Sequence, residues 1–251
     1  MEVHHHSSPA PSGTHTPRKK WTHYLWEFLM LFLAVFCGFL AEYKLEQTIE
    51  RHREKEFIES YIEDLKTDTS TLRRVTGFLE KRQIRLDSFL LMLKSHQIKG
   101  FENTLYYFGR SIVRSISFQS NDRTMTQLLN SGSMRLIRNK EAAEKMTLYK
   151  KDFDNLDGNQ QDEDLERKNC FPLLEKIYDP FVFDEMVDAK GINRIENNPP
   201  LRSYDPELQK DLAHTIHQLK GSCFLIINKL KVVRENAANL IVFLKKEYRL
   251  E

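Results

Sequence analysis

The chain has 251 residues, of which 29% are charged, and it contains only 9 glycines and 8 prolines. So few backbone breakers among so many charges favour an all-α protein over a sheet protein. The 38 basic and 36 acidic residues leave a net charge of +2, so the chain lacks the basic excess of a nucleic-acid-binding protein.

The first segment in chain order is a tail, residues 1–20, which is rich in Pro, Ser and His and poor in apolar residues. This composition predicts disorder. Three consecutive histidines, His4 to His6, could bind a metal ion loosely but could equally be incidental, and we assign no metal to them.

Residues 21–43 are predicted to cross a membrane as one helix. An uninterrupted apolar run extends from Phe28 to Ala41. Counted from Leu25, the stretch has about 17 residues, the short end of the range for a spanning helix, and it includes Glu27 near its start. Aromatic side chains typical of membrane interfaces stand at both ends, namely Trp21, Tyr24, Trp26 and Tyr43. A cleaved signal peptide is the alternative, but cleavage after Ala41 would place Phe39 at the −3 position, where a small residue is preferred.

The orientation of this span is predicted from the basic residues on its two sides. Lys and Arg are nearly equal in number before and after the apolar run, but those at 18–20 lie closest to the membrane edge. This favours a cytoplasmic tail and a domain on the far side.

Residues 44–251 are predicted to form a helical bundle with long first and last helices. Apolar residues recur every seven positions in the first helix and alternate every three and four in the last, which is typical of helices that pack on a partner helix. These packing positions are Leu65, Leu72, Leu79, Leu86, Leu93, Ile226, Leu230, Val233 and Leu240. The expected fold is therefore all-α, with one N-terminal transmembrane helix that continues into an elongated bundle.

Three local patterns set expected helix ends. Asp68-Thr-Ser indicates a break in the first helix, with Ser70 capping a new start. The acidic segment 152–166 is interpreted as loop-like, with a spacing that does not fit a calcium-binding loop. Asp205-Pro206 predicts the start of the last helix, since Pro is favoured in the first turn.

The sequence offers no specific metal or redox site. Cys37 lies in the apolar run, so Cys170 and Cys223 are the only possible disulfide pair, and we prefer two separate buried thiols. His214 and His217 are three residues apart, but two ligands do not make a zinc site. No metal and no cofactor is expected.

Catalytic motifs are also absent from the sequence: it holds no phosphate-binding glycine loop, serine elbow or zinc-protease signature. A polar cluster between 124 and 139 remains, made of Thr124, Gln127, Ser131, Gly132, Arg135 and Asn139. These residues either cap helices around a tight turn at Ser131-Gly132, which we prefer, or bind a ligand.

Two stretches of the chain resemble a known family. Residues 24–72, with WEFLMLFLAVFCGFLAEYKLE and REKEFIESYIEDLKTD, resemble the opening of bacterial single-pass membrane proteins of unknown function. Residues 124–139, TMTQLLNSGSMRLIRN, are similar to the second recurring stretch of that family. The resemblance implies a bacterial inner-membrane protein, with a periplasmic domain on the orientation above, and it supplies no catalytic residues.

Three functions follow as hypotheses. The first is a non-enzymatic interaction or scaffold module, tethered to a membrane, that binds a protein partner or a second copy of itself. The second is a sensory or ligand-binding bundle that acts through a partner. The third is an enzyme whose site carries no recognised motif.

Overall fold

The computed structural model describes residues 21–95, 98–189 and 191–251. The predicted tail, 1–20, with its histidines, lies outside the described residues. The described elements are the α-helices α1 (Trp21–Ser95), α2 (Glu102–Ile112), α3 (Arg123–Asn130), α4 (Lys140–Asn169), α5 (Phe171–Ile177), α6 (Pro180–Glu185) and α7 (Pro206–Tyr248), the 3-10 helix η1 (Ser133–Leu136), and the strands β1 (Val187–Asp188) and β2 (Gly191–Ile192). The two strands pair as a small antiparallel hairpin. The predicted all-α class is confirmed.

Contacts divide the chain into two units, 1–52 and 53–251. In the first unit, the described residues form the N-terminal part of α1, and residues 21–46 are all exposed. Among the described residues, α1 is the one helix that is long and apolar enough to cross a membrane.

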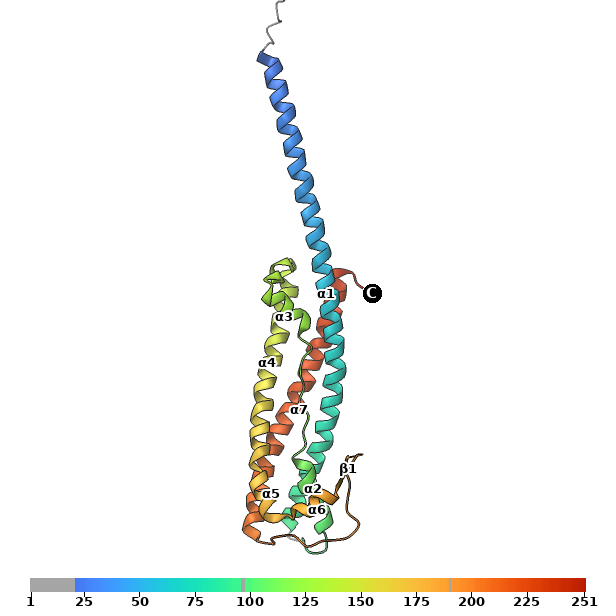
Figure 1. Ribbon diagram of the computed structural model, residues 1–251, viewed down its shortest axis with the longest axis vertical. Helices are drawn as coiled ribbons and strands as arrows, with labels where there is room; N and C mark the ends of the chain where they lie inside the picture. Colours follow the sequence, from blue (N-terminus) through green and yellow to red (C-terminus); the bar gives the residue numbers. More distant parts are fainter. Residues whose placement is uncertain (1–20, 96–97, 190) are drawn as a thin grey trace, which may run out of the picture. The chain divides into compact units, whose positions relative to one another are not determined.

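In the second unit, α1 and α7 lie side by side and antiparallel (Figure 1). Lys231 Nζ of α7 lies 2.7 Å from Glu80 Oε1 of α1, and the Tyr248 hydroxyl of α7 donates to Glu54 Oε1 of α1 at 2.7 Å. Residue numbers thus rise along one helix as they fall along the other.

Helix α4 completes the bundle and runs parallel to α1. The Tyr149 hydroxyl of α4 donates to Asp68 of α1 at 2.8 Å, and Glu163 of α4 lies 2.6 Å from Arg82 of α1. Two parallel helices cannot be joined by a tight turn, because the chain must first return to the end where α1 entered the bundle.

The return is made by an extended segment, residues 113–122, which Figure 1 shows in green between α1 and α4. Phe118 at its centre is fully buried and packs edge-on against Phe153 of α4, with ring centroids 5.7 Å apart. The segment therefore forms part of the core and is more than a surface connection.

The core follows the apolar spacing of the long helices. Each side chain of the two predicted seams is at most 5% exposed: Leu65, Leu72, Leu79, Leu86, Leu93, Ile226, Leu230, Val233 and Leu240. Burial of each such side chain contributes roughly 1.5–3 kcal/mol to folding.

The predicted break at Asp68 is wrong, because α1 continues through it. The Ser70 hydroxyl donates to the Thr67 carbonyl within the helix at 2.8 Å, so it caps no new start. Asp68 is buried and accepts hydrogen bonds from Ser120 and Asn121 across the bundle.

The predicted loop at 152–166 is also wrong, because α4 runs unbroken through it. One side of this stretch is buried at Leu156, Gln160 and Glu163. Tertiary contacts on that side offset the cost of Gly158 in a helix interior, which is about 1 kcal/mol.

Two predicted helix ends are confirmed. Asp205 caps α7, because its side chain accepts a hydrogen bond from the Glu207 backbone N–H at 2.9 Å. Gly132 follows the end of α3 with a φ of 66°, the left-handed conformation that glycine adopts without strain.

Candidate functional site

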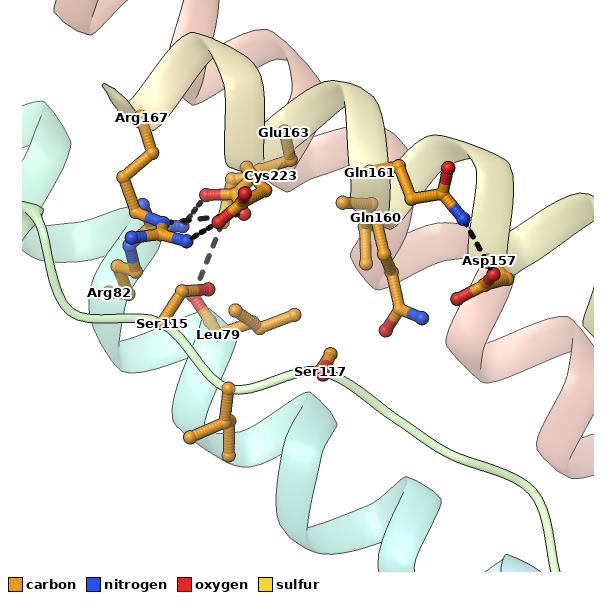
Figure 2. A pocket seen from close by; sticks show the side chains of 13 residues that line it. Leu79, Arg82, Ser115, Ser117, Asp157, Gln160, Gln161, Glu163, Arg167 and Cys223 are labelled. Carbon is orange, nitrogen blue, oxygen red and sulfur yellow. Dashed lines mark hydrogen bonds and ion pairs between the residues drawn. The ribbon is translucent and has the colours of Figure 1, made fainter. Parts of the chain in front are cut away.

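A cavity of about 300 Å³ lies among α1, α4, α7 and the extended segment 113–122 (Figure 2). Arg82, Glu163 and Arg167 gather at one end of the view, and Asp157 with Gln161 lies at the other. The lining thus combines both charge signs, the composition expected of a polar ligand site or of a structural hydrogen-bond network.

Arg82 is the most deeply placed charge of this lining and is fully buried. Its Nη1 lies 2.6 Å from Glu163 Oε1, and its Nη2 donates to the Ile112 carbonyl at 3.0 Å. A buried guanidinium is tolerated only when it is paired in this way. Its Nε has no hydrogen-bond partner among the described residues.

Two other polar side chains of the cavity, those of Gln160 and Arg167, hold the extended segment. Gln160 accepts from the Phe118 N–H at 2.7 Å and donates to the Phe118 carbonyl at 3.0 Å. Arg167 donates to the Val113 carbonyl at 3.1 Å. Because a lone extended segment has no neighbouring strand, these side chains satisfy backbone groups that burial would leave unpaired.

All three cysteines are free. Cys223, beside the cavity, donates from Sγ to the Leu79 carbonyl at 3.7 Å, and Cys170 donates to the Glu166 carbonyl at 3.8 Å. Burial raises the pKa of both thiols above the usual value. Since the thiolate is the nucleophilic form, neither group is set up for covalent catalysis.

A second polar cluster joins α1 to the start of α3. Asp64 of α1 accepts from the Thr124 N–H at 2.9 Å and from the Thr124 hydroxyl at 2.5 Å. It also accepts from Asn121 Nδ2 at 2.9 Å and from Arg123 Nη2 at 3.0 Å. Asp64 thereby caps the N-terminus of α3 from another helix, where a carboxylate also favours the helix dipole.

Asp68 extends this cluster by one turn of α1. It accepts from the Ser120 hydroxyl, the Asn121 N–H and the Tyr149 hydroxyl at 2.7 to 2.8 Å. Burial raises the pKa of Asp68, although the hydrogen bonds from Asn121, Ser120 and Tyr149 oppose that shift. Sequence reasoning missed both carboxylates as a pair, although the stretch YIEDLKTD places them four residues apart on one helix face.

The predicted polar residues of 124–139 do not converge on one pocket. Thr124 is buried against Asp64, whereas Gln127, Ser131, Gly132 and Arg135 are exposed. The Ser131 hydroxyl donates to the Gln127 carbonyl at 2.6 Å, and Asn139 caps α4 by accepting from the Ala142 N–H at 3.1 Å. These contacts are those of helix ends and a tight turn.

Metal-binding residue sets are not found in the part of the chain that the structure describes, where no three His, Cys, Asp or Glu side chains are placed to hold an ion. His214 and His217 are both exposed on α7. The four predicted membrane-interface side chains, Trp21, Tyr24, Trp26 and Tyr43, are exposed on α1.

One surface of the bundle combines exposed apolar side chains with ion pairs. Ile84 and Leu91 of α1 are 66% and 70% exposed, and Phe224 of α7 is 60% exposed. Two ion pairs join the helices beside them, Glu80–Lys231 and Asp87–Lys220. We call the surface formed by these seven residues the α1–α7 face.

The chain matches no protein-family model, no curated protein and no solved structure. What it does is therefore inferred from its own geometry. The cavity network, the Asp64 cluster and the α1–α7 face are the features available for that inference.

Proposed function

We propose that this chain is a non-enzymatic interaction module, anchored in a bacterial inner membrane by the N-terminal part of α1. The observation that carries the proposal is the uninterrupted apolar run 28–41, of which no residue is buried. Leaving one large apolar side chain in water rather than in an apolar medium costs roughly 1.5–3 kcal/mol. A lipid bilayer removes that cost for the whole run.

The second unit supports an interaction role over a catalytic one. Among the polar side chains that line its cavity, Gln160 and Arg167 hold the extended segment. Arg82 is paired with Glu163, and burial disfavours the thiolate form of Cys223. The α1–α7 face instead leaves large apolar side chains in water, as protein-binding surfaces do. The resemblance of 24–72 and 124–139 to bacterial single-pass proteins supports the membrane assignment, and the basic cluster before the span supports a periplasmic domain.

Crosslinking in cells tests this proposal. An amine-reactive reagent that passes the outer membrane but not the inner one is expected to trap the chain with a reproducible protein partner or with a second copy. Mass spectrometry identifies the product. The same reagent applied to opened cells is the control for sidedness.

Products that form only in opened cells would reverse the orientation. A chain that stays uncrosslinked in both samples would contradict the interaction role, and recovery of the protein in the soluble fraction would contradict the anchor.

Ligand binding is a second candidate function, favoured by one observation: Arg82 Nε is buried beside the cavity without a partner among the described residues. A ligand that supplies an acceptor there would stabilise the folded state by about 2.7 kcal/mol at one hundred times its dissociation constant. Thermal melting of the full chain in detergent against a metabolite panel measures this.

A matched variant makes the melting test specific. Ser117→Phe adds a bulky ring at an exposed lining position and should abolish the shift caused by any ligand of the cavity. A shift that survives this substitution would place the ligand elsewhere, and a panel with no shift would leave the interaction role as the supported function.

A further inference from the structure

Helix spacing places the exposed groups of the α1–α7 face along one side of each of two neighbouring helices. Steps of four, three and four residues place Glu80, Ile84, Asp87 and Leu91 along one side of α1. On α7, steps of four and seven place Lys220, Phe224 and Lys231 along one side. The α1 edge therefore holds the acidic groups and the α7 edge the basic groups.

The charge pattern is complementary to itself. A two-fold axis parallel to the helices and centred on the α1–α7 face sets α1 of one copy opposite α7 of the other, at the same height. Glu80 then meets Lys231 of the second copy, and Asp87 meets Lys220, while Ile84 approaches Phe224. No like charges are brought together by this operation.

The same symmetry suits an anchored protein. A two-fold axis along the helices keeps the start of the bundle part of α1 at the same end in both copies, as two chains inserted in one membrane with one orientation require. Confinement to a membrane also raises the effective concentration of one copy around another, so a modest surface can be enough for association.

We infer that the α1–α7 face is a homodimer interface, in which a second copy of this chain covers Ile84, Leu91 and Phe224 and exchanges the two ion pairs between subunits. This inference rests on the proposed interaction function and names its partner and surface.

Charge reversal on separate copies tests it. In one full-length chain, Glu80→Lys/Asp87→Lys makes all four charges of the face basic; in another, Lys220→Glu/Lys231→Glu makes them all acidic. Each variant alone is expected to lose the homodimer, and mixing the two, with different affinity tags in lipid nanodiscs, is expected to restore association. The side chains of all four residues are at least 36% exposed, so both variants should fold, which circular dichroism checks.

A matched control reverses two other acidic partners. Glu141→Lys/Asp154→Lys breaks two exposed ion pairs of α4, Glu141–Lys145 and Lys150–Asp154, and should leave the homodimer intact.

Cysteine crosslinking supplies an independent measurement in a Cys37→Ala background, since Cys170 and Cys223 are buried. Copies that carry Ile84→Cys should crosslink to differently tagged copies that carry Phe224→Cys. As a control, copies that carry Leu148→Cys on α4 should not crosslink to the Phe224→Cys copies.

Homodimers that persist in each charge variant alone would overturn the α1–α7 face as the interface while leaving the interaction function standing. A wild-type chain that binds a different protein but not itself would overturn the homodimer alone. A monomer with no partner in any sample would contradict the proposed function as well.

Discussion

Replacing Arg82 with methionine is expected to lower the free energy of unfolding of the bundle by about 3–5 kcal/mol, the usual cost of breaking a buried ion pair. The substitution leaves Glu163 buried without its 2.6 Å partner and leaves the Ile112 carbonyl without its donor. It also loosens the start of the extended segment, which follows Ile112 directly. Urea unfolding of the full chain in detergent, followed by far-UV circular dichroism, measures the loss.

The double variant Arg82→Met/Glu163→Met shows whether the loss of stability comes from the unpaired charge of Glu163 or from lost packing. Two apolar side chains of similar size remove both charges, so the double variant should be more stable than Arg82→Met alone. Arg135→Ala, at an exposed position, is the control and should change the free energy of unfolding by no more than about 0.5 kcal/mol. Glu163→Met completes the set. If the loss of unfolding free energy in the double variant equalled the sum of the losses in Arg82→Met and Glu163→Met, the ion pair would not explain the effect.

The long helices of the bundle could be predicted from the sequence because their buried sides are apolar at a regular spacing. In α7, Ile226, Leu230 and Val233 continue that spacing without a polar interruption, so burial follows from composition alone. The same logic worked for α1, whose seam stays apolar at Leu65 and Leu72 on the two sides of the predicted break.

The second half of α4 could not be predicted in this way. The buried side of the whole helix is apolar from Ala142 to Leu156, apart from the hydroxyl of Tyr149, but it continues with Gln160 and Glu163 at the same helical spacing. Polar residues at these positions end the hydrophobic periodicity, so the stretch resembles a solvated loop. They are buried because they serve the backbone of the extended segment and the charge of Arg82, partners that lie 42 and 81 positions away in the sequence.

The Asp64 cluster was missed for a related reason. Local rules look for a helix cap in the residue that precedes the helix, and Asp122 fits that rule for α3. In the structure the Asp122 side chain makes no capping hydrogen bond, and Asp64, nearly sixty residues earlier, binds the Thr124 N–H. Capping between distant segments has no local signature, because Asp64 and Thr124 lie 60 positions apart in the sequence.

Replacing Asp64 or Asp122 with alanine tests which of them caps α3. The local rule predicts the larger loss of stability for Asp122→Ala, whereas the structure predicts it for Asp64→Ala. Asp64→Ala removes the acceptor of four hydrogen bonds. It leaves the Thr124 N–H unpaired in a buried site, and the Thr124 hydroxyl keeps only its 3.0 Å contact with the Ser60 hydroxyl. An unsatisfied buried donor costs about 1–3 kcal/mol, so we expect a loss of about 2–4 kcal/mol in the free energy of unfolding. Asp122→Ala removes one exposed contact with the Thr126 hydroxyl and should cost less than about 0.5 kcal/mol.

Hydrogen exchange shows which part of the bundle is affected by Asp64→Ala, as well as how large the effect is. In Asp64→Ala, amides of α3 and of residues 119–122 should exchange faster than in the wild type, because α3 loses its tie to α1. The exchange rates of amides around Leu230 in α7 should rise only by the amount that the loss of global stability accounts for. Asp64→Asn retains one acceptor oxygen, and protection of α3 should lie between those of the wild type and Asp64→Ala. Faster exchange of the α3 amides in Asp122→Ala than in Asp64→Ala would show that α3 is capped locally, and Asp64 would then not be its cap.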